Sequence, residues 1–222
     1  MNKLLDRLSY KYGRLGIPNL MLYIVIAMAG VFVVELFVPE MPLSLYLYFS
    51  RDLMIYNGQW WRLISWIFIP GNTNIFFIIF SLYFYYLIGV GLEQQWGTFK
   101  FNVYYFMGVL LTIIGGFITG FASNTYLYYS MFFAFALLYP NFEVRLMFIL
   151  PLKIKWLALI DAVFFVIMLI MNIILGSWSD VAAIIVSMLN FVLFFYDDFG
   201  KFIKNQIYYA KHRQKYKNNR YR

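Results

Sequence analysis

The sequence of 222 residues contains no cysteine and a single histidine, His212. Without cysteine, the chain cannot form a disulfide, a thiolate metal site or a cysteine nucleophile. One histidine is too few for a histidine metal cluster, so we expect neither a metal nor a cofactor. Any chemistry would have to use hydroxyl, carboxylate or amide groups.

Charged residues are also scarce, at 13% of the chain against 63% hydrophobic residues. This composition is too apolar for a soluble domain of this length and predicts an integral membrane protein. Crossing a bilayer takes about 20 apolar residues. Stretches near that length predict an all-α bundle with six crossings, at residues 19–38, 74–91, 101–121, 126–140, 156–175 and 181–196.

The pieces outside the apolar region are too short to form a core of their own. We therefore predict a cytoplasmic N-terminal segment at 1–18, a membrane domain at 19–196 and a basic cytoplasmic tail at 197–222. With six crossings, all of the 18 Lys and Arg residues except Arg51 and Arg62 fall on the side of the termini. The positive-inside rule predicts that this side is cytoplasmic. The compact plan favours a bacterial plasma membrane.

The tail mixes Lys and Arg with Tyr and Asn, as KFIKNQIYYAKHRQKYKNNRYR. Such a mixture is found in nucleic-acid-binding segments, but beside a membrane helix it favours an arm held against anionic lipids. We expect membrane lipids as partners and no nucleic acid. Residues 39–72, between the first two crossings, are rich in Trp, Tyr and Phe, which predicts a long loop lying in the outer membrane interface.

Three residues near the end of the second apolar segment share one helical face if the helix continues that far: Gly89, Glu93 and Gly97. Small residues at this spacing let another backbone approach closely, and Glu93 can then bond to its exposed polar groups. Gly116 and Gly120 repeat the spacing in the third segment. There we expect ordinary packing between helices.

Three stretches together resemble the rhomboid family of intramembrane serine proteases. They are GQWWRLISWIFI (58–69), GVGLEQQWG (89–97) and FALLYPNFEVRLMFILPLKIKWLAL (135–159). The first is similar to the family's Trp-Arg motif and the second to its Gly-xxx-Glu-xxx-Gly pattern. The resemblance implies a six-helix rhomboid-like bundle with five structural motif residues: Trp61, Arg62, Gly89, Glu93 and Gly97.

The family's chemistry uses a serine in a Gly-x-Ser-Gly motif and a histidine in the sixth helix. Counting back from Pro140, the resemblance implies that the serine motif corresponds to SNTY, residues 123–126, with Thr125 at the serine position. By spacing, the histidine position falls near Val186. The positions of two family residues that stabilise the oxyanion become Phe77 and Ser81. A hydroxyl without a base is a poor nucleophile, so the resemblance implies no catalytic residues.

These residues favour a catalytically inactive rhomboid-like protein that binds transmembrane segments of client proteins or perturbs the bilayer locally. One alternative is a divergent intramembrane hydrolase that uses Thr125 or Ser130, although Ser130 is expected to bond to its own helix. Another is a small transporter or channel, because Glu35, Asp161 and Asn190 are polar groups in or near hydrocarbon. The expected structural roles are interfacial bonding of Glu35 and Asp161 near helix ends, and bridging of helices by Asn190.

Overall fold

The computed structural model describes residues 3–71, 74–146, 150–178, 181–182, 184–186 and 188–196. Within these ranges, four helices are long and apolar enough to cross a membrane: α2 (Leu20–Phe37), α6 (Ile75–Trp96), α7 (Thr98–Thr119) and α9 (Ile154–Ile174). Two shorter apolar helices are also present, α8 (Asn124–Leu138) and a helix at Ile184–Tyr196. The protein is thus a mostly helical membrane protein, and each predicted apolar segment contains a helix.

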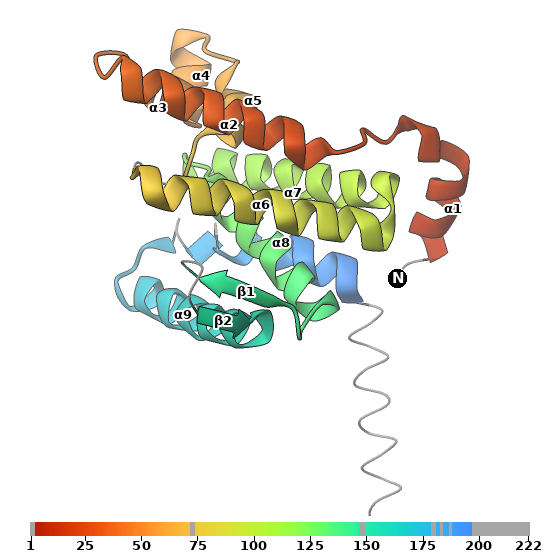
Figure 1. The fold of residues 1–222 in the computed structure, drawn as a ribbon. Coiled ribbons are helices and arrows are strands. Elements are labelled where there is room, and N and C mark those ends of the chain that lie inside the picture. Colours follow the sequence, from red (N-terminus) through yellow and green to blue (C-terminus); the bar gives the residue numbers. More distant parts are fainter. Residues whose placement is uncertain are drawn as a thin grey trace, which may run out of the picture.

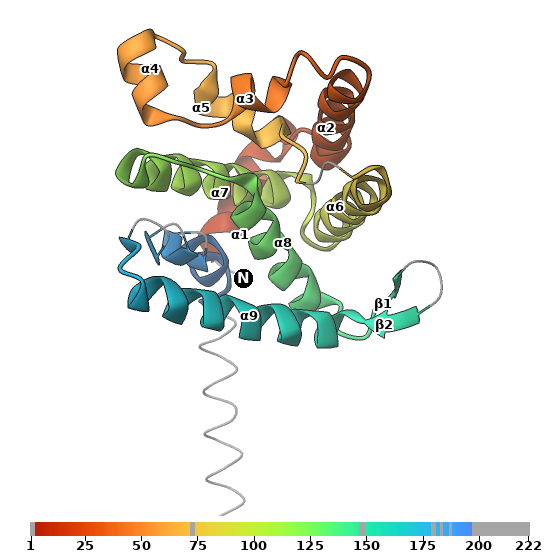
Figure 2. The same cartoon turned by 90° about the vertical axis from the view of Figure 1, so that its left-hand side faces the viewer.

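The helices form layers that are visible in two perpendicular views (Figures 1 and 2). The α2 and α6 helices lie side by side in Figure 1 and are both foreshortened in Figure 2, so they are nearly antiparallel. The α8 helix lies between the layer of α6 and α7 and the outer helix α9 (Figure 2). Because α9 is extended in both views, it is inclined to α2 and α6.

The core is centred on α8, which contacts helices on two sides. On the side of α6, the ring of Tyr128 stacks on Tyr85 with centroids 3.9 Å apart. On the side of α9, Phe133 meets Phe165 edge to face at 6.2 Å. By contrast, Ile154 is the only residue of α9, all of which the structure describes, that is buried. The inner helices α6, α7 and α8 therefore make the core, and α9 covers it loosely.

The loop after α2 folds into short helices: α3 (Leu43–Leu47), α4 (Arg51–Asn57), α5 (Arg62–Ser65) and the 3₁₀ helix η2 (Trp66–Phe68). Phe49 and Trp66 are buried in the core, whereas Tyr56, Trp60 and Trp61 are exposed. Exposed aromatic rings of this kind are stable at the boundary between lipid and water. The expected interfacial loop is therefore a folded element with one buried and one aromatic face.

The connection between α8 and α9, which lies between two predicted crossings, contains a short β-hairpin. There, β1 (Glu143–Leu146) pairs antiparallel with β2 (Leu150–Lys153), at the edge of the molecule in Figure 2. Proline lacks an amide hydrogen and disfavours helix interiors, so Pro151 disfavours a continuous helix here, and a short strand at a sheet edge tolerates it.

The N-terminal segment contains α1 (Lys3–Tyr12) and the 3₁₀ helix η1 (Gly13–Leu15). In Figure 1, α1 lies across the end of the bundle where α2 begins. The Lys100 ammonium at the start of α7 donates to the Asp6 carboxylate at 2.5 Å, which fastens α1 to α7. The predicted tail at 197–222, with His212, lies outside the described residues.

Candidate functional site

Arg62 holds the loop after α2 in its folded form. Its side chain is 4% exposed, and its guanidinium donates to the carbonyl oxygens of Leu45 at 3.1 Å and Tyr48 at 2.9 Å. Its Nε donates to Gln59 Oε1 at 2.6 Å. The neighbouring Trp61 donates its indole N–H to a carbonyl of α3 at 3.1 Å while its ring stays exposed. The buried cation therefore replaces water for several loop carbonyls at once.

Glu93 joins the starts of two helices. The α6 helix continues past it, and its Oε1 accepts the backbone N–H of Asn19 at 3.2 Å and the Thr98 hydroxyl at 2.8 Å. Asn19 precedes α2 and Thr98 begins α7, so the carboxylate lies where helix dipoles favour negative charge. Beside it, Asn102 bonds to both the N–H and the carbonyl of Ile17, at 2.8 and 3.0 Å.

Gly89 and Gly97 have different roles, although they share a helical face. A Cβ added at Gly89 would lie 2.0 Å from Met21 Cγ, so α2 and α6 can approach only because this residue is glycine. At Gly97, an added Cβ would meet nothing within 4 Å, but φ is +83°. Gly97 makes the turn between α6 and α7, where other residues are strained. The expectation of close packing is therefore wrong for Gly97.

The pair Gly116 and Gly120 does not pack one helix against another. A Cβ at Gly116 would lie 2.7 Å from Phe49 Cε1, so this glycine accommodates the loop after α2. Gly120 has φ +88° and ends α7. The expectation of ordinary helix packing is wrong for both, because sequence spacing alone does not distinguish a packing glycine from a helix cap.

The stretch at the family's serine motif forms the start of α8. The Ser123 hydroxyl accepts the backbone N–H of Thr125 at 3.2 Å and donates to its Oγ1 at 2.9 Å. The Thr125 side chain is exposed. Between them, Asn124 is buried and its amide donates to the carbonyls of Ile67 at 3.2 Å and Ile69 at 2.7 Å. Asn124 thus closes the loop against α8, a role that the sequence did not indicate.

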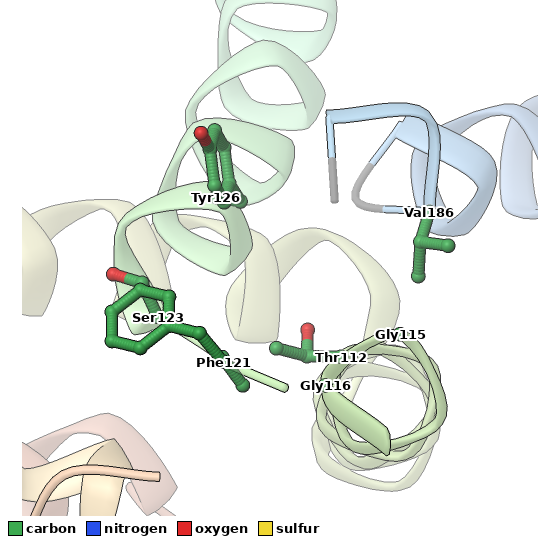
Figure 3. Close-up of a pocket in the computed structure, with 8 residues that line it drawn as sticks. Thr112, Gly115, Gly116, Phe121, Ser123, Tyr126 and Val186 are labelled. Carbon is green, nitrogen blue, oxygen red and sulfur yellow. The ribbon is translucent and has the colours of Figure 1, made fainter. Parts of the chain in front are cut away.

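Val186, at the expected histidine position, and Tyr126, next to the expected serine position, line the same small cavity. A cavity of about 10 Å³ lies among α7, α8 and the last described helix, room for about one water molecule. Figure 3 shows Ser123, Tyr126 and Val186 around it. A Cβ added at Gly115 would lie 3.2 Å from Val186 Cγ1, which shows how closely Val186 packs on α7. A peptide bond does not fit into such a cavity.

The two oxyanion positions on α6 do not line this cavity. Phe77 is 51% exposed. The Ser81 hydroxyl donates to the carbonyl of Ile78 in its own helix at 3.0 Å. Neither side chain therefore directs a donor toward Val186 or Thr125.

Ser130 is 1% exposed and lies 2.6 Å from the hydroxyl of Tyr104 on α7. The expectation that Ser130 bonds to its own helix is wrong, since Tyr104 also donates to the Ser130 carbonyl at 2.9 Å. The amide of Asn190 donates to the Tyr104 carbonyl at 3.3 Å. Asn190 therefore bridges two helices, as expected.

The two carboxylates proposed for an ion path lie in different environments. Glu35 Oε1 accepts the backbone N–H of Ser44 at 2.6 Å, which confirms a bonding role at the end of α2. Asp161 is the eighth residue of α9, because that helix begins at Ile154. It is half-buried and has no hydrogen bond or ion pair within the described part of the chain. The expectation that it lies near a helix end is wrong.

Among the described residues, no group of three or more His, Cys, Asp or Glu side chains could hold a metal ion. Comparison of the chain with models of protein families, with characterised proteins and with solved structures gives no match. The site must therefore be interpreted from its own geometry.

Proposed function

We propose that this protein is a rhomboid-like membrane protein that binds transmembrane segments of other proteins, or perturbs the bilayer around them, without hydrolysing them. The observation that carries the proposal is the cavity beside Val186, which has room for about one water molecule. The contacts of Arg62 and Glu93, at the family's structural motifs, are satisfied in the same molecule. A retained scaffold around a filled catalytic position supports binding rather than hydrolysis.

The energetic argument agrees with this interpretation. Loss of a general base costs about a hundredfold to ten-thousandfold in rate, and loss of an oxyanion donor roughly a further hundredfold or more. Thr125 has no base among its hydrogen-bond partners, and Ser130 is bonded to Tyr104. Neither hydroxyl is arranged to attack a peptide bond.

A groove between α6 and α8 supports a place for a client helix. It has a volume of about 270 Å³. Its lining includes Leu87, Val90, Phe135 and Tyr139. At its base, a Cβ added at Gly91 would lie 2.4 Å from Phe135 Cε2, so the two helices are in tight contact. Such an apolar groove with a few hydroxyls fits the side chains of a helix that approaches through lipid.

The proposed topology has six crossings with both termini in the cytoplasm of a bacterial cell. The 15 residues of α8 extend for about 22 Å, less than the hydrocarbon thickness of about 30 Å, so α8 would span only as an inner helix surrounded by protein. Because the chain has no cysteine, single cysteines can test this. An impermeant thiol reagent added outside should label Tyr56→Cys and not Lys153→Cys; the reverse pattern would contradict the orientation.

Client binding is tested by photo-crosslinking in native membranes. A photoreactive residue at Leu87, in the groove, should capture transmembrane proteins, whereas one at Ile79, which is exposed on α6 outside the groove, should capture fewer. Equal yields at the two positions, or none above a protein with scrambled helices, would argue against the groove as a binding site.

Hydrolysis is tested with a fluorophosphonate probe on folded protein in bilayers. We expect no labelling of the unsubstituted protein. Labelling that disappears in Thr125→Ala or in Ser130→Ala would identify a nucleophile and replace the binding proposal with an enzymatic one.

A further inference from the structure

Asp161 is a carboxylate inside an apolar helix and has no partner in the described part of the chain. It lies seven residues beyond Ile154, about 10 Å along α9. The side chains one turn away on its own helix are apolar, including Leu157, Ala158 and Phe164. The nearest preceding cation, Lys155, has its ammonium over the ring of Trp156 at 5.7 Å. An ionisable group at this depth is costly unless it pairs with an opposite charge.

Neighbouring contacts show which way Asp161 faces. Phe165, one turn further along α9, packs edge to face on Tyr129 and Phe133 of α8, at 5.8 and 6.2 Å. Residues four apart lie on one face of a helix, so Asp161 lies on the side of α9 toward α8. The carboxylate is therefore at the edge of the contact between α8 and α9, half-buried and still accessible.

Asp161 and the groove between α6 and α8 lie on different sides of α8. The backbone N–H of Lys155 donates to the carbonyl of Pro140 at 3.2 Å, so the end of α8 and the start of α9 are side by side. Counted from that bond, Phe135 in the groove and Asp161 are both about 8 Å along their helices. Phe135 faces α6, whereas Phe133 meets α9, so a client helix would reach Asp161 along the exposed side of α9 rather than through the groove.

We propose that Asp161 recognises a Lys or Arg within the transmembrane segment of a client protein, by forming an ion pair inside the membrane. The inference rests on the proposed client-binding function and names the chemistry of the client. Charge complementarity selects this occupant, because a purely apolar helix would leave the carboxylate unpaired. The exposed surface of α9 leaves room for such a helix to approach.

The test uses purified protein in phosphatidylcholine vesicles with synthetic transmembrane helices. Each helix has a Leu-Ala sequence, one photoreactive residue, and Lys, Leu or Glu at the depth of Asp161. We expect the unsubstituted protein to capture the Lys helix about tenfold more than the Leu helix. Asp161→Asn should reduce capture of the Lys helix to that of the Leu helix, and Asp161→Lys should prefer the Glu helix.

The control is Asp52→Asn, which removes an exposed carboxylate paired with Arg51 in α4 and should leave capture unchanged. Circular dichroism and elution volume establish that each variant is folded. Equal capture of the Lys and Leu helices, with no effect of Asp161→Asn, would overturn the ion pair while leaving client binding intact. Capture of no helix by the folded protein would contradict the proposed function itself.

Discussion

The inner helix α8 and the outer helix α9 are both apolar, but their polar side chains are bonded differently. In α8, the polar groups Asn124 and Ser130 are buried and bonded to neighbouring segments. In α9, which is the most apolar of the four long helices, most side chains are exposed, and Asp161 has no hydrogen bond or ion pair in the described part of the chain. The polar groups Asn124 and Ser130 therefore hold inner segments together, whereas Asp161 in α9 is available for an interaction outside the fold.

The same contrast separates two carboxylates. Glu93 accepts two hydrogen bonds at the starts of α2 and α7, and so it compensates its own desolvation. Asp161 has the cost of an apolar environment, and no residue in the described ranges gives it a compensating hydrogen bond or ion pair. A carboxylate in a membrane helix is thus structural or functional according to its neighbours, and substitutions should separate the two cases.

The largest effect is expected from overpacking the inner helices. Gly89→Val places a side chain where Met21 Cγ already lies 2.0 Å from a Cβ, so we expect destabilisation by about 3 kcal/mol or more. Gly30→Val on α2 is the matched control, because an added Cβ there meets nothing within 4 Å. Unfolding by detergent titration measures both. Similar stabilities of the two variants would mean that α2 and α6 are not in close contact.

Removing the buried guanidinium should be the next most costly change. Arg62→Leu leaves the carbonyls of Leu45 and Tyr48 without a donor, and we expect a loss of about 2 kcal/mol. Arg51→Leu removes a partly exposed cation that bonds to the neighbouring Asp52 and to the Phe117 carbonyl of α7, and it should cost less than about 1 kcal/mol. Protease sensitivity of the loop after α2, measured beside stability, should rise only in Arg62→Leu. A rise in both variants would show that Arg62 has no special role.

The two carboxylates should respond with opposite signs. Glu93→Gln weakens the charged hydrogen bonds to Asn19 and Thr98, so we expect a loss of about 1 kcal/mol. Asp161→Asn removes an unpaired charge from an apolar helix and should leave stability unchanged or raise it. Unfolding curves of both variants without client peptides give the comparison. A clear loss in Asp161→Asn would indicate an internal partner and remove the basis for a client ion pair.

The smallest effect concerns α1, outside the bundle. The hydrogen bond from Lys100 holds the pKa of the Asp6 carboxyl below its ordinary value. Because the folded pKa is lowered, the stabilising contribution is present above the ordinary Asp pKa of about 4 and is lost as the pH falls through the folded value. A fluorophore on Tyr10→Cys should report release of α1 in that acidic range. The response should be absent in Asp6→Asn, and a response that persists there would assign it to another group.

The positions of the helices can be predicted from the sequence, because the length and apolarity of a segment are properties of its own residues. The end of α6 was placed too early, at residue 91 rather than Trp96, because Glu93 and the two glutamines after it interrupt the apolar run. The roles of Gly97 and Gly120 as turn residues were missed because their positive φ angles depend on where the next helix must go. The partner of Ser130 was missed because Tyr104 comes from another helix.

The candidate site shows the same division. The resemblance implies reactive positions at Thr125 and Val186, but only the structure locates Val186 beside a cavity of about 10 Å³ and Thr125 on an exposed surface. No sequence pattern around Asn124 or Asn102 indicated that these two amides have a structural role. Their importance comes from backbone groups that neighbouring segments present to them.

By itself, the sequence determined that this is a membrane protein made of apolar helices, because hydrocarbon accepts only segments with satisfied backbone groups and apolar side chains. It also determined that no cysteine or histidine metal chemistry is available. The tertiary structure alone decided which polar groups are partnered, since a hydrogen bond depends on distances between segments far apart in the chain. For that reason the different roles of Glu93 and Asp161 became apparent only in the fold.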